Sequence, residues 1–394
     1  MKTICMITIS SYPHDPRIRR EVEELEKNGY EIDIISISFE NQKEVEKYGN
    51  ITAYRVAKYL PGREELIPYL VYSFLYMIKS FFKLQQLHKK RKYSLIQIHN
   101  MPDYLIFVAF IQKLLKVPLI LDIHDLTLEL FEEKWPGLKY KFIKRIIKKI
   151  EKISCSFADH IITVTEGCKE KLVQRGVPSN KITLILNTAN IKIFKFSTRS
   201  EYQIINKNAK LIYHGTVAKR FGIHLIIDAM KFVIEKIPGS VINIYGRYDS
   251  NYKSYLNERI SVLGLSENVK LNGVLDRDEV PDVIRNSDIG VVPYLNNPYM
   301  HLALPTKACE FAAIGIPIVS TYLHTMALTF GSDSISFVNS ENPEEFADRI
   351  IELCLNPELR KLRVDEAYQD VSKISWEVMG KQYTDLINHL TNYN

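Results

Sequence analysis

The sequence predicts an α/β protein built from two Rossmann-like, doubly wound domains. Three observations lead to this prediction. The chain has 394 residues, more than a single hydrophobic core usually serves. Short β-branched runs alternate with segments of helical period in both halves of the chain. An irregular polar stretch within residues 191–208 separates the halves. We therefore place one domain at residues 1–190 and the second at 209–375.

The first half opens with a strand, a helix and a second strand. A β-branched run covers residues 3–9, a helix of period 3.6 ends at Gly29, and the next strand covers residues 32–37. No G-x-G-x-x-G follows the first strand, which argues against a nicotinamide-dependent enzyme. Asp15 is expected to cap the helix and Pro16 to be its first residue. Capping alone explains this loop, with its arginines solvated, but it leaves room for a ligand role.

Two later strands of the first half end in histidine. They cover residues 93–99 and 119–123, and they are followed by Asn100 and by His124. Ligands of open α/β sheets bind at the carboxyl ends of strands, so His124 is a candidate site residue. The alternative is a histidine satisfied by backbone at a strand end. Histidine and aspartate also ligate zinc, but no short-range ligand spacing supports a metal site, and we expect no metal.

Residues 138–153 form the sharpest surface feature of the sequence. A helix here places basic residues on one face: Lys141, Lys144, Arg145, Lys148, Lys149 and Lys152. The other face is apolar: Phe142, Ile143, Ile146, Ile147, Ile150 and Ile153. In one interpretation the apolar stripe packs on the first sheet and the lysines are solvated. In the other, the cationic face lies against anionic lipid, which contributes roughly 1 kcal/mol per basic residue. Nucleic acid is not an expected partner, because no aromatic platform or known motif accompanies the charges.

Composition points to the cytoplasm, with peripheral membrane contact left open. The balance of 52 Lys and Arg against 46 Asp and Glu is only mildly basic. Five cysteines form no C-x-x-C pair and are expected to be buried thiols of a reducing compartment. The apolar run at residues 3–9 is too short for a secretory signal. The apolar segment at 66–87 is broken by charged residues and by proline, so we do not expect it to span a bilayer.

The second half restarts with a strand that ends in His214-Gly215-Thr216. Gly215 would allow a ligand to approach the backbone closely, and Arg220 is the cation best placed to meet that ligand. A helix starts at Gly222, and further strands are expected at 242–245, 269–271 and 289–293. This alternation repeats the doubly wound pattern of the first half.

The most informative stretch covers residues 299–321. Pro305 and Thr306 mark a helix start, Gly315 marks its end, and a buried strand follows at 317–319. The helix start carries unpaired N–H groups and a positive dipole end, which together attract phosphate. Glu310 lies about one turn inside and could accept two hydroxyl hydrogen bonds, as a ribose offers. The alternative is a helix that only packs on its sheet, with Glu310 on the wet side.

The same stretch resembles a known signature. Pro305-Thr306-Lys307, Glu310-Phe311 and Gly315-Ile316-Pro317 are similar to the donor-binding motif of the family 4 retaining glycosyltransferases, which have the GT-B architecture. The resemblance covers nearly the whole chain. It implies two domains facing across a cleft, a hinge at 191–208, and a helix at 376–394 that crosses back onto the first domain. Leu302 stands where many members carry an acidic residue.

The resemblance also assigns roles to residues. The implied donor-binding residues are Gly215, Thr216, Arg220, Val274, Thr306, Lys307 and Glu310. The implied acceptor-side residues are His14, Asp15, Arg17 and Asn100. We expect His124, Arg220 and Glu310 to carry the chemistry, and the resemblance implies that His124 lies near the reacting sugar. The family usually places an arginine directly after the first glycine, where this chain has Thr216, and Arg220 is the neighbouring cation.

The function implied is a retaining hexosyl- or N-acetylhexosaminyl-transferase. Its donor would be a UDP- or GDP-type sugar and its acceptor a glycan or a lipid-linked molecule, with no metal or other cofactor. The expected setting is bacterial surface polysaccharide or glycolipid assembly. Two alternatives stay open. A nucleotide-sugar 2-epimerase shares the architecture but needs no acceptor, and a non-catalytic two-lobed sugar-nucleotide-binding protein would need an export signal, which we do not find.

Overall fold

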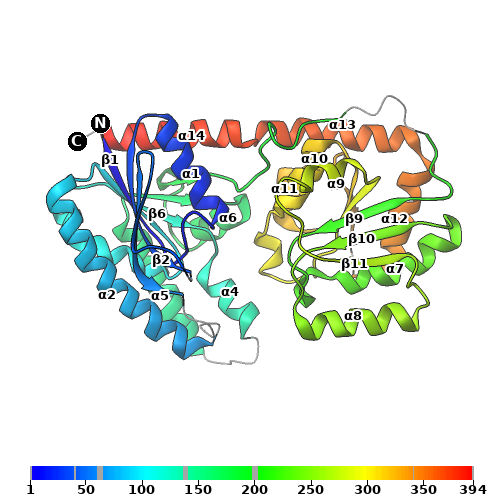
Figure 1. Ribbon diagram of the computed structural model, residues 1–394, viewed down its shortest axis with the longest axis horizontal. Coiled ribbons are helices and arrows are strands. Elements are labelled where there is room, and N and C mark those ends of the chain that lie inside the picture. The colour runs from blue at the N-terminus through cyan, green and yellow to red at the C-terminus, as the bar shows by residue number, and fades with distance from the viewer. Residues whose placement is uncertain are drawn as a thin grey trace. The chain divides into compact units, whose positions relative to one another are not determined.

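A computed structural model gives the architecture of the chain (Figure 1). It describes residues 2–39, 41–59, 65–135, 141–197, 203–339 and 341–392. The chain forms two compact units. The first unit comprises Met1–Leu186 together with Met379–Asn394, and the second comprises Asn187–Val378. Each unit has its own sheet and its own buried core, and the two are treated separately below.

The described part of the first unit contains an eight-stranded sheet. In spatial order its strands are β3 (Val45–Tyr48), β4 (Ile51–Lys58), β2 (Glu31–Ser38), β1 (Thr3–Ile7), β5 (Leu95–His99), β6 (Leu119–Ile123), β7 (His160–Thr163) and β8 (Ile182–Leu184). All neighbours are parallel except β3 and β4. The order of the chain reverses between β1 and β5. A doubly wound sheet binds its ligands at that reversal, outside the carboxyl ends of the strands.

Helices surround this sheet. They are α1 (Pro16–Lys27), α2 (Leu66–Arg91), η1 (Asp103–Ala109), α3 (Phe110–Leu114), α4 (Thr127–Lys134), α5 (Lys141–Phe157), α6 (Glu166–Gln174), η2 (Ser179–Lys181) and α14 (Trp376–Asn392). As expected, Asp15 caps α1 by accepting from the Arg17 backbone N–H, and Pro16 is the first helical residue. Helices α2 and α5 both pack on η1.

The second unit repeats the pattern with a six-stranded parallel sheet in its described residues. The strand order is β11 (Val269–Asn272), β10 (Val241–Tyr245), β9 (Lys210–His214), β12 (Ile289–Val292), β13 (Ile318–Thr321) and β14 (Ser336–Val338). Its helices are η3 (Lys219–Phe221), α7 (Ile223–Lys236), α8 (Ser250–Val262), α9 (Val280–Arg285), η4 (Met300–Leu302), α10 (Thr306–Ile314), α11 (His324–Thr329), α12 (Pro343–Leu355) and α13 (Pro357–Lys373). Here the chain order reverses between β9 and β12, which marks the ligand edge of this unit.

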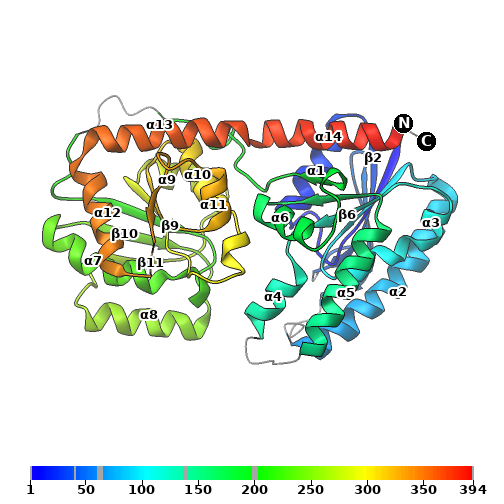
Figure 2. The same cartoon turned by 180° about the vertical axis from the view of Figure 1, so that it is seen from behind.

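The predicted α/β class is confirmed in both units, and so is the return of the C-terminal helix. Residues 379–392 of α14 belong to the first unit (Figures 1 and 2). Lys2 Nζ donates to the Thr391 backbone oxygen at 3.0 Å, so the two ends of the chain lie side by side. Tyr30 Oη donates to Asn388 Oδ1 at 2.5 Å on the same helix.

The segment expected to be a hinge is packed where the structure describes it. Residues 198–202 lie outside the described residues. Before them, the Ser197 N–H donates to the Ile314 oxygen, and the Phe196 ring lies 4.1 Å from the Tyr368 ring, centroid to centroid. After them, the Ile205 N–H donates to the Cys354 oxygen. These contacts bind the described parts of the segment to the second unit.

The apolar face of α5 is only partly buried, although one interpretation of the sequence packed this stripe on the first sheet. Phe142 is 70% exposed, Ile146 41% and Ile153 47%. The buried positions of α5 include Glu151, whose Oε2 accepts from Arg175 Nη1 at 2.6 Å. Burial raises the pKa of Glu151 to about 7, against the opposing charge of Arg175. The helix thus turns a carboxylate inward, and part of its apolar stripe is left in solvent.

Residues 138–140, also part of the predicted amphipathic helix, lie outside the described residues. The five cysteines are all buried and free, as predicted. The described helices include none that combines the length and the apolar character needed to cross a bilayer.

Candidate functional site

A polar pocket of about 340 Å³ lies at the ligand edge of the first unit. Loops that follow β1, β5 and β6 supply its walls, since the carboxyl ends of these parallel strands meet there. Asp15, Arg17, Asn100 and His124 all line it, so the structure brings together four residues that the sequence marked as candidates.

Asp15 and Arg17 form a fixed pair at the start of α1. Arg17 Nη2 donates to Asp15 Oδ2 at 3.0 Å, and Ser10 Oγ donates to the same oxygen at 3.0 Å. Burial opposes ionisation of Asp15, but the hydrogen bonds and charge of Arg17 outweigh it and hold the pKa of this carboxyl well below its ordinary value. The pair therefore keeps one guanidinium at the pocket wall, already oriented by its partner carboxylate.

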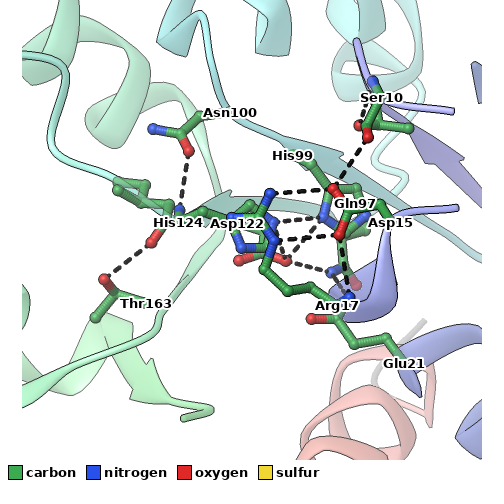
Figure 3. Close-up of polar contacts among 12 residues, drawn as sticks. Ser10, Asp15, Arg17, Glu21, Gln97, His99, Asn100, Asp122, His124 and Thr163 are labelled. Atoms are coloured by element: carbon green, nitrogen blue, oxygen red, sulfur yellow. Dashed lines mark hydrogen bonds and ion pairs between the residues drawn. The ribbon is translucent and has the colours of Figure 1, made fainter. Parts of the chain in front are cut away.

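His99, Asp122 and His124 form a buried cluster behind the pocket (Figure 3). His99 Nδ1 lies 2.9 Å from Asp122 Oδ2 and 3.1 Å from His124 Nε2, and the two imidazole planes are tilted by only 10°. Burial lowers the pKa of His124 to about 3. His124 is therefore neutral at physiological pH.

Further buried polar groups hydrogen-bond to this cluster through Gln97. Gln97 Nε2 donates to Asp122 Oδ2 at 3.0 Å and to Glu21 Oε2 at 2.7 Å, while Gln97 Oε1 accepts from Tyr383 Oη at 2.6 Å. Burial, followed by the charge of Asp122, raises the pKa of Glu21 well above its ordinary value. One buried amide thus joins the cluster to α1 and α14.

Asn100 fixes the backbone of the His124 loop. Its Oδ1 accepts from the His124 N–H at 2.9 Å (Figure 3). Its Nδ2 donates to the Asp125 oxygen at 2.8 Å and to Asp103 Oδ1 at 2.9 Å. The sequence marked Asn100 as a residue on the acceptor side. In the structure it lines the pocket and also sets the position of His124.

The cluster bears on the metal question raised by the sequence. Of the residues that the structure describes, His99, Asp122 and His124 form the group whose ligand atoms converge closely enough to hold an ion. Nitrogen and carboxylate oxygen are ligands that zinc accepts. The distances from His99 Nδ1 to Asp122 Oδ2 and to His124 Nε2 are also those of hydrogen bonds, which a proton on one imidazole nitrogen can form without any metal. Because all three groups are nearly inaccessible to solvent, an ion here would have little room for an exchangeable ligand.

His14 does not line the polar pocket, although the sequence placed it on the acceptor side. Its Nδ1 lies 3.3 Å from Ser11 Oγ and 3.4 Å from Gln42 Nε2. Its ring packs edge-on against Phe39, with the centroids 5.3 Å apart. The side chain is thus directed toward the loop that follows β2, and the cations that line the pocket are Arg17 and Lys134.

The ligand edge of the second unit is built around Gly215. This glycine has φ of +114°, and a Cβ there would lie 3.4 Å from Lys307 Cε and Nζ. Gly246 stands beside it, where a Cβ would come within 1.7 Å of the Gly215 oxygen. Only residues without a side chain permit this packing. The end of β9 therefore presents bare backbone next to one lysine, as the sequence predicted for Gly215.

Lys307, the second residue of α10, is buried among aromatic rings. Its Nζ donates to Tyr294 Oη at 2.8 Å and lies 4.5 Å from the centroid of the Tyr213 ring. Burial lowers the pKa of Lys307 to about 7, and the charge of Glu310 only partly opposes this. A lysine with a pKa near 7 is only partly protonated at neutral pH, and a bound anion would favour its protonated form.

Glu310 lies about one turn further along α10, beside His214 at the end of β9. His214 Nε2 lies 3.1 Å from Glu310 Oε2, and both side chains are largely shielded, with 12% and 13% exposed. His214 Nε2 makes no hydrogen bond of acceptable geometry with the described residues. The pair therefore places a carboxylate and a buried imidazole at the same edge of the sheet as Gly215.

The remaining donor-side candidates surround this edge. Thr306 begins α10, which has no side-chain cap at its start, and Gly315 ends it with φ of +93°, both as predicted. Arg220 is exposed on η3, with its guanidinium 4.8 Å from the centroid of the Phe221 ring. Thr216 is exposed next to Gly215, and Val274 is 72% exposed after β11. Thr216, Arg220 and Val274 follow carboxyl ends of strands in the second unit, and Thr306 starts α10.

Comparison with known proteins decides the family. The profile described as Glycosyltransferase Family 4 matches residues 17–192, and the profile described as Glycosyl transferases group 1 matches residues 194–370. The chain belongs to the family 4 glycosyltransferases. As a glycosyltransferase it has the GT-B fold, and the resemblance first seen at residues 305–317 is confirmed across both units.

Relatives of this glycosyltransferase cover nearly its whole length at low identity. It is 24% identical to a chitobiosyldiphosphodolichol beta-mannosyltransferase of Debaryomyces hansenii, over 97% of this chain and 88% of the relative. It is 22% identical to a capsular polysaccharide biosynthesis glycosyltransferase of Staphylococcus aureus, over 98% of this chain and 97% of the relative.

Solved structures share its fold. A sucrose-phosphate synthase from Thermosynechococcus elongatus has a TM-score of 0.76 at 17% identity and covers 100% of both chains. Anabaena HepE in complex with UDP-glucose has a TM-score of 0.68 at 15% identity, covering 99% of this chain and 100% of that one.

Sequence reasoning about this glycosyltransferase placed His99 and His214 at the ends of strands, but it did not predict which side chains would surround them. His214, Tyr213 and Tyr294 surround Glu310 and Lys307, and His99 and Asp122 stand behind His124. A signal was present, because His99 and His214 each end a buried strand directly before an Asn or Gly loop. The side chains that contact His99 and His214 come from other strands and helices, so these contacts depend on the order of strands in the sheet and could not be predicted from local sequence.

Proposed function

We propose that this protein is a retaining glycosyltransferase that uses a nucleotide-diphosphate sugar. The sugar transferred would be a hexose or an N-acetylhexosamine, and the acceptor a glycan or a lipid-linked molecule. The setting we propose is the assembly of a bacterial surface polysaccharide or glycolipid. No metal or other cofactor takes part in the reaction as proposed.

One observation carries the donor side of the proposal: Lys307 Nζ lies directly against Gly215 at the ligand edge of the second unit. A diphosphate approaching the bare backbone of Gly215 would meet that ammonium together with the uncapped start of α10. Glu310, on the next turn, is placed to accept hydrogen bonds from ribose hydroxyls. Val274 would offer backbone atoms to the base.

The comparisons support this choice of donor. HepE was crystallised with UDP-glucose, and a trehalose-6-phosphate enzyme structure from E. coli, with a TM-score of 0.73, contains UDP-2-fluoro glucose. The names of two relatives, a diphosphodolichol-dependent mannosyltransferase and a capsular polysaccharide enzyme, support an acceptor that is lipid-linked or part of a surface glycan.

The proposed reaction exchanges one bond at the anomeric carbon. The bond from this carbon to the diphosphate oxygen breaks, and a bond to the acceptor oxygen forms on the same face. The acceptor's proton passes to the departing diphosphate, so no protein carboxylate is needed as a nucleophile. Arg220 and Lys307 would stabilise the charge that develops on the diphosphate. His124, neutral because it is buried, would hydrogen-bond a hydroxyl of the transferred sugar.

A nucleotide screen tests the proposal. The thermal midpoint of the protein is measured with uridine, guanosine, adenosine and thymidine diphosphates, each at the same concentration. We expect one base to raise the midpoint clearly, because a ligand that binds only the folded state stabilises it by mass action. The proposal fails if none of the four does so. Incubation with the matching sugar nucleotide and no acceptor should then leave the donor intact, whereas a 2-epimerase would convert it.

We also propose that α5 contacts an anionic membrane surface through its basic residues. Lys148, Lys149 and Arg145 are exposed there, and Phe142 and Ile146 expose apolar surface beside them. A helix that combines exposed lysines with exposed apolar side chains suits the headgroup region of a bilayer. Such contact would place the first unit at the cytoplasmic face, where a lipid-linked acceptor resides.

A further inference from the structure

An apolar groove of about 280 Å³ lies in the first unit, between α2, η1, α4 and α5. Its walls include Leu66, Tyr104, Phe131, Trp135, Ile143 and Ile147. The carboxylate of Asp103 also borders it, but Asn100 and Thr127 already hydrogen-bond its two oxygens. The groove is therefore suited to a hydrocarbon and offers little to a sugar, a nucleotide or a phosphate.

The groove adjoins the polar pocket that is lined by Arg17 and His124. Tyr69, Met101 and Lys134 line both cavities. A ligand that filled both would have a polar end beside His124 and an apolar end between α2 and α5. The structure thus provides for one amphiphilic molecule rather than for two unrelated ligands.

Lys134 marks the junction between the two cavities. It is the last residue of α4, it is exposed, and it has no acidic partner among the residues that the structure describes. A cation at the boundary between a sugar-sized pocket and an apolar groove is complementary to a phosphate that joins a sugar to a lipid.

The rim of the groove is apolar as well. Leu70 of α2 and Ile146 of α5 line the groove and are 44% and 41% exposed. Next to them along α2, Val71 and Phe74 are 55% and 53% exposed. Exposed apolar surface that continues a groove marks an interaction site. It lets a lipid chain pass from a bilayer into the groove without crossing polar surface.

We propose that this groove binds the hydrocarbon chain of a lipid-linked acceptor, whose phosphate lies at Lys134 and whose sugar lies beside His124. The inference rests on the proposed function, because it takes the polar pocket as the acceptor side of the site. It narrows the acceptor from a glycan in general to a sugar carried on a phosphorylated lipid. It also gives α2 and α5 a role in acceptor recognition beyond contact with the membrane surface.

Prenyl diphosphates of increasing length are the probe. Binding of inorganic pyrophosphate, geranyl, farnesyl and geranylgeranyl diphosphate to the full chain is measured by calorimetry, below the critical micelle concentration of each. Each methylene transferred from water into an apolar site improves binding by about fourfold at most. We expect the dissociation constant to fall at least about tenfold from the geranyl to the geranylgeranyl compound. A constant that does not change with chain length overturns the proposal.

Two variants on one helix provide a matched comparison. Ile146→Asn and Ile153→Asn change the same residue type at similar exposure, 41% and 47%, but only Ile146 lines the groove. We expect Ile146→Asn to flatten the dependence on chain length and Ile153→Asn to preserve it. Equal effects of the two would mean that α5 merely touches lipid, and would refute the groove. If light scattering detects a dimer of the parent protein and Ile146→Asn abolishes it, a second copy of the chain covers the groove, and the proposal of a lipid ligand is refuted.

Lys134→Ala separates the head of the ligand from its tail. This change should weaken binding of all three prenyl diphosphates by a similar factor and leave the gain from each added prenyl unit intact. A variant that binds all three as tightly as the parent would remove Lys134 from the proposal. Nucleoside diphosphate binding is recorded for every variant. Its retention alongside a lost chain-length effect refutes only the groove, whereas its absence from the parent protein refutes the proposed function itself.

Discussion

Tyr383 Oη donates a 2.6 Å hydrogen bond to Gln97 Oε1, which joins α14 to β5 in the buried centre of the first unit. The other end of the same amide donates to Asp122 Oδ2, the oxygen that also lies 2.9 Å from His99 Nδ1. A residue near the end of the chain therefore orients the amide that supports the cluster around His124. The C-terminal helix therefore supports the histidine cluster and does more than cover the sheet.

Removing this hydroxyl should be costly. In Tyr383→Phe the Gln97 oxygen is left buried without a donor, and we expect the free energy of unfolding to fall by about 1–3 kcal/mol. Urea denaturation measures the change. Tyr30→Phe is the matched control, because its partner Asn388 lies on the same helix but the bond is only partly buried. Equal losses in both variants would contradict the special position of Tyr383.

We expect Lys307 to take up a proton when the donor binds. Its pKa is lowered to about 7 by burial, so at pH 8 most molecules without a ligand carry a neutral Lys307. A bound diphosphate would favour the charged form and draw in a proton. Calorimetry at pH 8 in buffers of different ionisation enthalpy should show close to one proton taken up per nucleoside diphosphate. Lys307→Met should bind more weakly and take up none.

The same shift predicts a dependence of stability on pH. The unfolded chain holds the Lys307 proton up to about pH 10.5, whereas the folded chain releases it near pH 7. Because the unfolded state binds more protons between these values, this group makes the folded state more stable as pH rises through that window. The difference in unfolding free energy between Lys307→Met and the parent should therefore shift in the parent's favour between pH 7 and pH 10.

Substitutions of Glu310 and Arg220 should change different kinetic constants. Glu310→Ala should raise the donor KM strongly with a smaller effect on kcat, because ribose contacts are made equally in the ground state and the transition state. Arg220→Ala should lower kcat more than it raises KM, because charge develops on the diphosphate only as the bond breaks. Steady-state kinetics with the donor varied measures both. Unchanged turnover in Arg220→Ala would remove that residue from the mechanism.

His124 predicts a loss of stability in mild acid. Its pKa is lowered to about 3 in the folded chain, against an ordinary value of 6.5. The unfolded state binds this proton first, so the contribution of His124 is full above pH 6.5 and declines as pH falls toward 4. Denaturation of the parent and of His124→Asn across this range should show a shallower decline in the variant. Parallel curves would mean that His124 is protonated in both states alike.

Membrane contact through α5 should depend on charge. Lys148→Glu combined with Lys149→Glu should reduce sedimentation with phosphatidylglycerol vesicles several-fold, and high salt should weaken binding of the parent. Lys231→Glu with Lys236→Glu on α7 is the control of equal charge. If both double variants bind alike, the attraction comes from net charge and not from α5.

The sequence could predict those features that depend on local chemistry. Asp15 and Pro16 begin α1, and Thr306 and Gly315 bound α10, because capping and backbone freedom are properties of single residues. Most strands could be located because buried parallel strands are runs of β-branched residues, but β3, β4 and β14 were not predicted. Glu310 was found because it is the one carboxylate in an apolar helix.

The missing parts depend on packing between elements that are distant in sequence. The sequence marked Lys307 as a donor-binding residue but did not predict its burial, because the two tyrosines that enclose it come from β9 and from the end of β12. The apolar face of α5 looked like a core stripe, but Glu151 is drawn inward by Arg175 of the loop after α6, and Phe142 is left outside. The hydrophobic period of one segment cannot predict which side chains of a distant segment will pack against it.

The return of α14 to the first unit has a consequence for dividing the protein. Because the first unit is assembled from both ends of the polypeptide, no single cut between residues 187 and 378 yields it intact. A stop codon that deletes only residues 379–394 would remove Tyr383 and expose the floor of the histidine cluster. A circular permutant that fuses the adjacent termini and opens the chain after Leu186 would instead encode the first unit as one continuous stretch.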